Sequence, residues 1–243
     1  MATFGNAYGL DCIAHRGYSA NATENTLDSL HASWAAGADL VEADVWLLAD
    51  GELALFHDRE VRGAVVSELT YPKLQSLLDF HLPKLEEALD VIPKDKGIVV
   101  DLKTSCHKTR DRLLALFDRL KPEYRVIIQS SDLSALQYMD EKTEYDFDLH
   151  YLSHLKRSGL TRQPPSAGDL AKRLVEAGID GISFKGRQFI DQDFVDLLKS
   201  AGLRCFVWTI NDPERMLYYS NLKVDGVITK DPPAFRRTIT EKD

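Results

Sequence analysis

The sequence is poor in cysteine, and this scarcity limits the covalent and metal chemistry open to the chain. Its 243 residues include three cysteines, Cys12, Cys106 and Cys205, an odd number at wide spacing. That pattern fits neither a disulfide framework nor a zinc motif. Cys12 and Cys205 lie in apolar runs typical of strands, so we interpret them as small core residues.

Long apolar runs are also missing. No stretch approaches the ~20 consecutive apolar residues that a membrane-spanning helix needs. The first residues, MATFGNAYGLD, have neither the basic start nor the apolar stretch of a secretion signal. We therefore expect no membrane insertion and a reducing, cytoplasmic location.

Basic residues are not in excess. Lysine and arginine number 30 against 38 aspartates and glutamates, which gives a net charge of −8 at pH 7. Nucleic-acid binding needs a basic stripe that replaces phosphate counterions, so we expect no nucleic-acid partner. The same balance argues against docking on anionic membranes. Nothing resembles a Walker loop or a dinucleotide fingerprint.

What the chain does have is a regular alternation of strand and helix patterns. Eight apolar segments are predicted strands, at 11–15, 39–47, 97–103, 124–130, 146–151, 180–184, 203–208 and 224–229. Helical patterns lie between them at 25–36, 84–91, 107–120, 132–141, 167–177, 191–201 and 213–220, and from 232 onward. Strands each followed by a helix predict a closed parallel sheet, and such folds typically have ~250 residues. We therefore predict the α/β class, a single (β/α)8 TIM-type barrel domain over 1–243, with a short insertion or lid at 59–83 after the second strand.

Polar residues of catalytic type are concentrated in the segment 13–58. Glu42 and Asp44 stand two apart in a predicted strand, so their side chains share one face. Two neighbouring carboxylates repel unless a cation or a proton lies between them. Two further pairs end apolar runs, His15 with Arg16 and His57 with Asp58. Together these residues suit a hard divalent cation, an acid, a base and a phosphate anchor, which indicates metal-assisted phosphodiester chemistry.

The order HRG (15–17), ENT (24–26), EAD (42–44) and HD (57–58) resembles the glycerophosphodiester phosphodiesterase family. Weaker similarity continues through VVDLK (99–103), FVWTIN (206–211) and VDGVITKDP (224–232), and so covers nearly the whole chain. The resemblance implies hydrolysis of glycerophosphodiesters to glycerol 3-phosphate and an alcohol. Two departures stand out: the family commonly has Glu where this chain has Asp101, and its Arg-Thr-Thr run after HD is absent here.

Candidate site residues follow from this resemblance and from the rule that barrel sites lie at the C-terminal ends of strands. The metal ligands would be Glu42, Asp44 and Asp101; the catalytic acid–base pair would be His15 and His57; phosphate or substrate would contact Arg16, Lys103, Lys185 and Trp208. Oxygen ligands favour Mg²⁺, with Ca²⁺ possible, over zinc. The expected partner is a small-molecule phosphodiester.

Each assignment has an alternative in the sequence. Arg16 can pair with Glu24, Asp101 can simply pair with Lys103, Lys185 can be a solvated lysine and Trp208 a core residue. The ENT segment is expected to cap the first helix and to orient His15 or Arg16. The remaining histidines are read as surface or core residues: His31, His81, His107, His150 and His154.

Several functional questions stay open in the sequence. It is compatible with either histidine as the acid, and with attack by water or by a glycerol hydroxyl that gives a cyclic phosphate. Alternative functions are a phosphodiesterase for a sugar phosphodiester or a lysophospholipid, and an inactive barrel that binds phosphorylated metabolites. The sequence carries no signal for oligomeric state.

Overall fold

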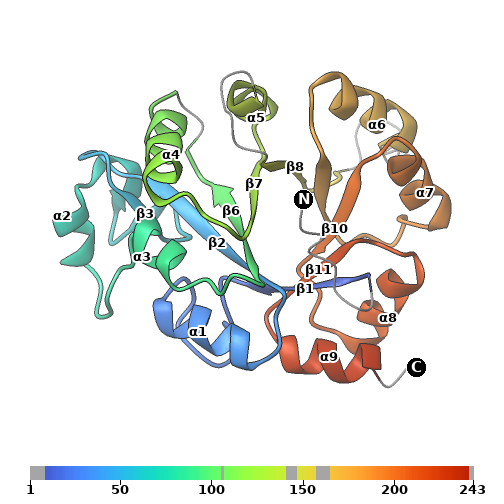
Figure 1. Cartoon of the computed structure of the whole chain (residues 1–243), viewed down its shortest axis with the longest axis horizontal. Helices are drawn as coiled ribbons and strands as arrows, with labels where there is room; N and C mark the ends of the chain where they lie inside the picture. Colours follow the sequence, from blue (N-terminus) through green and yellow to red (C-terminus); the bar gives the residue numbers. More distant parts are fainter. Residues whose placement is uncertain (1–8, 105–106, 141–146, 157–164, 241–243) are drawn as a thin grey trace.

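The computed structural model describes residues 9–104, 107–140, 147–156 and 165–240. In this part of the chain, helices surround a central sheet of parallel strands (Figure 1). The strands of the barrel are β1 (Asp11–His15), β2 (Leu40–Leu47), β6 (Gly97–Leu102), β7 (Arg125–Ser130), β8 (Asp148–Ser153), β9 (Gly181–Lys185), β10 (Arg204–Trp208) and β11 (Gly226–Thr229). Because β1 pairs with both β11 and β2, the sheet closes on itself. The predicted (β/α)8 barrel is confirmed; Cys106 and the predicted element ends at 141 and 146 fall outside the described residues.

Helices connect the strands, and their ends follow the capping signals of the sequence. They are α1 (Leu27–Ala35), α3 (Leu85–Asp90), α4 (His107–Leu120), α5 (Leu133–Asp140), α6 (Ala167–Glu176), α7 (Gln192–Ser200), α8 (Pro213–Asn221) and α9 (Pro232–Thr240). The side chains of Thr26 and Asp212 accept hydrogen bonds from first-turn N–H groups of α1 and α8. Gly37 and Gly202, which follow α1 and α7, both have φ of +85°. That conformation favours glycine, which is the usual residue after the end of a helix.

The last helix, α9, binds the segment that leads into β2. In Figure 1, α9 lies beside α1, although the two are at opposite ends of the sequence. Arg236 donates from Nε to the Gly37 carbonyl at 2.8 Å and from its guanidinium to Asp39 at 2.6 Å. Asp39 also accepts the Cys12 N–H of β1 at 2.8 Å. One arginine of α9 thereby ties together the segments that enter β1 and β2.

The insertion after β2 forms a small layer of its own at the left of Figure 1. It contains β3 (Leu53–Leu55), which pairs antiparallel with β2, then β4 (Glu60–Val61), β5 (Ala64–Val65), the 3-10 turn η1 (Val66–Glu68) and α2 (Tyr71–Gln75). Its buried core comprises Trp46, Leu48, Ala54, Val66, Leu74 and Leu82. Since Trp46 and Leu48 belong to the end of β2 and the residue after it, the insertion packs on an extension of a barrel strand. The short insertion expected after the second strand is therefore present.

Alternation along the strands sorts the barrel interior into layers, because every second side chain points inward. At the N-terminal end an ion network crosses the barrel, formed by Asp11, Arg125, Asp148 and Arg204. Above it lies an apolar layer of Ile13, Leu40, Val99, Ile127, Phe206 and Ile228. His150 is fully buried against Gly181, where a Cβ would come within 2.4 Å of its ring. The interior is thus filled, and polar groups above this layer face the open C-terminal end.

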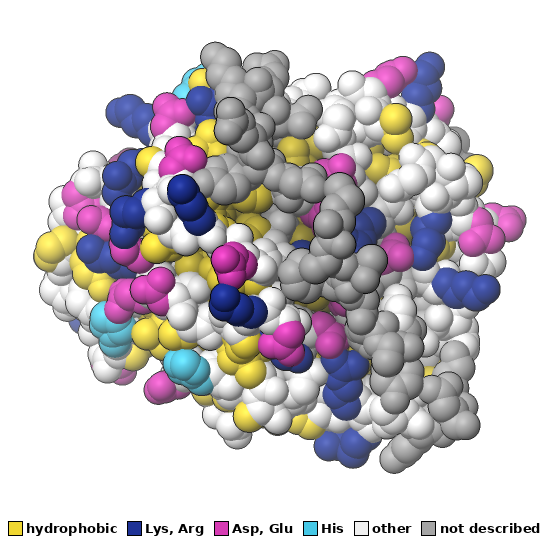
Figure 2. Space-filling view, viewed as in Figure 1, with side chains coloured by type: hydrophobic (Ala, Val, Ile, Leu, Met, Phe, Trp, Pro, Cys, Tyr) yellow, Lys and Arg dark blue, Asp and Glu magenta, His cyan; other side chains and the backbone are white. Residues whose placement is uncertain are grey.

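The outer surface carries charges of both signs. On the face drawn in Figure 2, acidic and basic side chains are interspersed, as on an ordinary solvated surface. No helix among the described residues is long and apolar enough to cross a membrane. Cys12 and Cys205 are buried free thiols, as the sequence indicated.

Candidate active site

Three carboxylates meet inside the barrel mouth. Glu42 and Asp44 follow Leu40 on the inward face of β2, and Asp101 follows Val99 on β6, where it pairs in register with Asp44. Their exposed fractions are 2%, 1% and 4%, respectively. One oxygen from each carboxylate lies within 4.8 Å of the others. This cluster has the donor type and spacing for one divalent cation.

A lysine ammonium lies between two of these acids. Lys103 Nζ is 2.6 Å from Asp44 Oδ1 and 2.5 Å from Asp101 Oδ2. Burial disfavours the Asp44 carboxylate, but Lys103 and Arg16 together outweigh burial and lower its pKa. Burial raises the pKa of Asp101 to about 6 despite Lys103, with Asp44 adding repulsion. Burial, with repulsion from Asp44 and Asp101, also raises the pKa of Glu42 well above its usual value. The cluster therefore has more buried negative charge than its neighbouring cations neutralise.

Asn25 holds Asp44 in place, a role that the sequence analysis did not assign. Its Nδ2 donates to Asp44 Oδ2 at 2.9 Å, and its Oδ1 accepts the Asp44 backbone N–H at 3.1 Å. Asn25 is buried and has φ of +56°, a region that Asn tolerates better than most residues. The ENT segment thus has three separate contacts: Glu24 pairs with Arg16, Asn25 binds Asp44, and Thr26 caps α1.

The two candidate catalytic histidines face the same cavity from different elements. His15 ends β1, and its Nε2 lies 4.0 Å from Glu42 Oε2. Burial, followed by the charge of Arg16, lowers the pKa of His15 to about 3. His57 follows β3, and its Nδ1 lies 2.8 Å from Asp58 Oδ1. A carboxylate on one ring nitrogen fixes the orientation of the imidazole and leaves the other nitrogen for proton transfer.

Arg16, which follows His15 in the sequence, contacts the carboxylates of the site. Its backbone N–H donates to Glu42 Oε2 at 2.9 Å, and its side chain contacts Glu24 at 2.7 Å and Asp44 at 3.0 Å. The pairing with Glu24 considered from the sequence is therefore present. Arg16 nevertheless lines the cavity together with Lys103, so both cations are within reach of a ligand there.

The opposite wall of the cavity is aromatic and basic. Trp208 ends β10 and donates from Nε1 to the Ser183 carbonyl at 3.0 Å. Lys185 stands exposed at the rim, with its ammonium 5.8 Å from the Trp208 ring centroid. The ring of His154 meets that of Trp208 edge-on at 5.0 Å.

The cavity between these walls measures about 160 Å³. Its lining comprises His15, Arg16, Glu42, Asp44, His57, Asp101, Lys103, Gln129, Leu152, His154, Trp208 and Ile228. The structure thus brings together eight of the nine sequence-predicted site residues, with Lys185 at the edge. Gln129 and His154 were missed as site residues. Their inward position near the C-terminal ends of β7 and β8 is the signal that could have found them.

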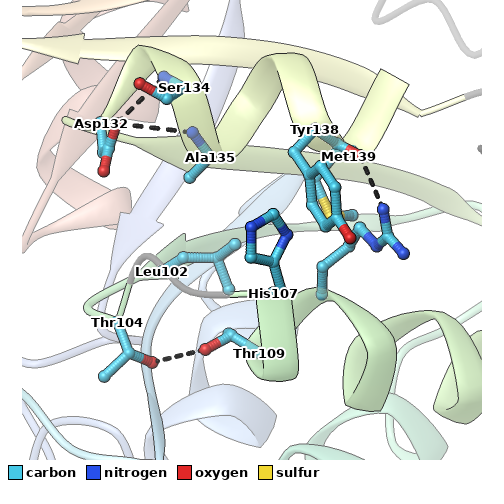
Figure 3. Close-up of a pocket in the computed structure, with 10 residues that line it drawn as sticks. Leu102, Thr104, His107, Thr109, Asp132, Ser134, Ala135, Tyr138 and Met139 are labelled. Atoms are coloured by element: carbon cyan, nitrogen blue, oxygen red, sulfur yellow. Dashed lines mark hydrogen bonds between the residues drawn. The ribbon is translucent and has the colours of Figure 1, made fainter. Parts of the chain in front are cut away.

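A second cavity, of about 130 Å³, lies between α4 and α5 (Figure 3). Its polar groups are largely bonded to one another. Thr109 donates to Thr104 at 3.1 Å, and Asp132 accepts the N–H of Ser134 at 2.9 Å. The described residues that line it include His107 but no cluster of acids like the one in the barrel mouth.

Comparison with known proteins agrees with this geometry. The family model "Glycerophosphoryl diester phosphodiesterase family" matches residues 15–234. A glycerophosphodiester phosphodiesterase of Caldanaerobacter subterraneus is 27% identical over 239 residues, which cover 90% of this chain and 93% of that protein.

Solved structures show the same fold. A glycerophosphodiester phosphodiesterase from Thermotoga maritima is 27% identical with a TM-score of 0.77, and the match covers 94% of this chain and 97% of that one. An Oleispira antarctica phosphodiesterase in complex with the product sn-glycerol-3-phosphate is 26% identical with a TM-score of 0.77, covering 95% and 96%. Because the family model spans most of the chain, this protein belongs to the glycerophosphoryl diester phosphodiesterase family.

Proposed function

We propose that this protein hydrolyses glycerophosphodiesters to glycerol 3-phosphate and an alcohol with the help of a divalent cation. The observation that carries the proposal is the convergence of three carboxylates, two histidines, an arginine and a lysine on one cavity at the barrel mouth. Family membership supports the substrate class, and the product-bound Oleispira enzyme supports the glycerol phosphate half.

Glu42, Asp44 and Asp101 are the residues that would hold the cation. Their buried negative charge and the raised pKa of Glu42 and Asp101 are what is expected of carboxylates whose charge a bound cation would neutralise. An all-oxygen set suits Mg²⁺ or Ca²⁺. We favour Mg²⁺, because the short Asp101 leaves room for the waters that this ion retains. When bound, such an ion would stabilise negative charge on the phosphate oxygens.

His15 and His57 are proposed to move the protons. One histidine accepts a proton from the attacking hydroxyl, which belongs to water or to the substrate glycerol, as the new P–O bond forms. The other donates a proton to the alcohol oxygen as the old P–O bond breaks. Where the glycerol hydroxyl attacks, this step leaves a cyclic phosphate, and water then opens the ring in a second displacement to give glycerol 3-phosphate. His15 at the end of β1 and His57 after β3 line the same cavity, which supports one acting as acid and the other as base. The side chains of Arg16 and Lys103 are proposed to hold the phosphoryl oxygens.

An activity panel tests the proposal. Glycerophosphocholine, glycerophosphoethanolamine and glycerophosphoinositol would be offered with Mg²⁺, with Ca²⁺ or with excess chelator, and released glycerol 3-phosphate measured. We expect turnover with a cation and its loss on chelation. Substrate binding without turnover under every condition would favour a phosphometabolite-binding barrel instead. Full activity in chelator after dialysis would remove the cation from the proposal.

A cytoplasmic location is proposed on the two buried free thiols.

A further inference from the structure

Four basic side chains surround one half of the barrel mouth. Lys156 follows β8, Lys185 ends β9, Arg187 lies two residues beyond it, and Lys230 directly follows β11. Alternation places Lys185 above Ser183 and Lys230 above Ile228, on the inward face of their strands. These strands are neighbours in the sheet, with Trp208 of β10 between them. These four basic residues thus lie at or just after the C-terminal ends of neighbouring strands, and we call them the basic rim.

The charges of the basic rim act on histidines that line the cavity. Burial lowers the pKa of His154, a cavity residue, and the charges of Lys156, Lys185 and Arg187 lower it further. Lys230 acts in the same direction on His15, after burial and Arg16. Arg187 is also fixed in place, because Nε and one terminal nitrogen both donate to the His154 carbonyl at 3.1 Å.

The basic rim has no acidic partner in the part of the chain that the structure describes. Within the described segments, no carboxylate oxygen lies within 4.0 Å of the cationic nitrogens of these four side chains. Other cations of the barrel are neutralised, such as Arg125 by Asp11 and Lys199 by Asp225. Among the acids of the loops at the mouth, Glu24 and Asp58 are engaged by Arg16 and His57 on the carboxylate side. Asp231, which follows Lys230 in the sequence, accepts the N–H of Ala234 at 3.1 Å. Uncompensated positive charge at the mouth of a site selects an anionic ligand.

The aromatic surface next to the basic rim is already in contact with polar groups. A quaternary ammonium would bind best over the face of an aromatic ring such as Trp208. The Lys185 ammonium lies 5.8 Å from that ring centroid, and the His154 ring meets it edge-on. A cationic headgroup would therefore meet like charge at the position where it could stack.

These observations bear on the substrate, given the hydrolysis proposed above. In a glycerophosphodiester the glycerol carries no charge, and the phosphoryl group is assigned to the carboxylate side of the mouth. Only the alcohol half can then supply a charge that complements the basic rim. We infer that the preferred substrates are glycerophosphodiesters whose alcohol bears a second phosphate group, and that choline and ethanolamine diesters are poor substrates.

The test compares three substrates that differ in the charge of the alcohol. These are glycerophosphoinositol, glycerophosphoinositol 4-phosphate and glycerophosphocholine, assayed with Mg²⁺ by release of glycerol 3-phosphate. We expect kcat/KM to be at least about tenfold higher for the phosphorylated inositol than for the neutral one, and lowest for choline. This preference should shrink as salt is raised, because exposed charges are screened.

A charge-removing variant identifies the residues responsible. Two exposed charge interactions are each worth about a two- to fivefold effect, so Lys156→Gln combined with Lys185→Gln should lower the ratio of the two inositol substrates about four- to twenty-five-fold. Lys172→Gln removes a charge from the exposed face of α6 and should leave the ratio unchanged. The ratio is read from one protein preparation at a time, so a general loss of activity does not affect it.

The outcomes separate this inference from the proposed function. Failure to cleave any of the three diesters with Mg²⁺ or Ca²⁺ would refute the hydrolysis itself. Equal cleavage of all three would leave hydrolysis standing and overturn the substrate preference. An equal fall for all three in the double variant would overturn it too, because the basic rim would then act only on the common phosphodiester. If the double variant failed to fold, the salt dependence of the wild-type ratio would decide, and its absence would refute the inference.

Discussion

Substitutions at Asn25 test the support of the Asp44 carboxylate separately from the capping of α1 by Thr26. Asn25→Gly removes both side-chain hydrogen bonds to Asp44 and keeps a backbone that reaches φ of +56° without strain. Asn25→Ala removes the same bonds but, unlike the glycine variant, keeps a Cβ in the left-handed region without the asparagine side chain that tolerates it. The two variants therefore differ mainly in backbone strain.

The contacts set the size of the effect. The bond from Nδ2 goes to a buried carboxylate, and such bonds contribute about 1.5–3 kcal/mol. The Asp44 N–H would also lose its partner in a buried place, which costs about 1–3 kcal/mol unless water enters. We expect the free energy of unfolding of Asn25→Gly to fall by about 2–4 kcal/mol, and that of Asn25→Ala by about 1 kcal/mol more. Metal affinity should fall about 10–100-fold, as is usual when a group that orients a ligand is lost.

Two measurements are needed. Urea unfolding in excess chelator reports stability without any contribution from bound metal. Calorimetric titration with Mg²⁺ then gives affinity at a temperature where each variant is folded. The control is Thr26→Ala, which removes the side-chain cap of α1, should cost about 1 kcal/mol and should leave metal affinity unchanged. If Asn25→Gly lost stability but bound Mg²⁺ within about threefold of wild type, well short of the loss expected for a group that orients a ligand, Asn25 would be a folding residue only.

Three further predictions concern the proposed chemistry. His15→Ala and His57→Ala should each lower kcat by about 10²–10⁴-fold, and a variant retaining more than about a tenth of the activity would show that its histidine is not the acid or base. Asp101→Glu should keep activity and shift the preference from Mg²⁺ toward Ca²⁺, which accepts looser coordination; an unchanged ratio of the two activities would exclude Asp101 as a ligand. Because the pKa of Asp101 is raised to about 6 in the folded protein, the metal-free protein should lose stability as pH rises from about 4 through about 6. The gain in Tm on adding Mg²⁺ should consequently be larger at pH 7.5 than at pH 4.5, and an equal gain at both would contradict the raised pKa.

The fold was predictable because its signals are local. Apolar runs mark the strands, and Thr26, Asp212 and Gly202 mark helix ends within a few residues. The shared face of Glu42 and Asp44 likewise follows from their spacing alone.

Contacts that depend on distant segments were less accessible from sequence. Asn25 reaches Asp44 because the chain after β1 turns through the left-handed residues Arg16, Gly17 and Asn25. A local reading of ENT finds the helix cap and a contact with His15 or Arg16, but not the bond from Asn25 to Asp44. The place of His154 in the site depends on its ring contact with Trp208, which lies on a strand two places away in the sheet. Side chains that act across the barrel therefore escape an analysis that follows one segment at a time.

The pairing of β1 with β11 has a consequence for folding during translation. All the proposed metal ligands and both histidines are synthesised within the first 103 residues, but the strand that covers the free edge of β1 ends at Thr229. Until then a nascent chain exposes an unpaired strand edge beside three acids that repel one another. Arg236 of α9, which binds Gly37 and Asp39, is translated later still. Maturation of the catalytic half must therefore wait until β11 and α9 have been synthesised, however early its own residues emerge.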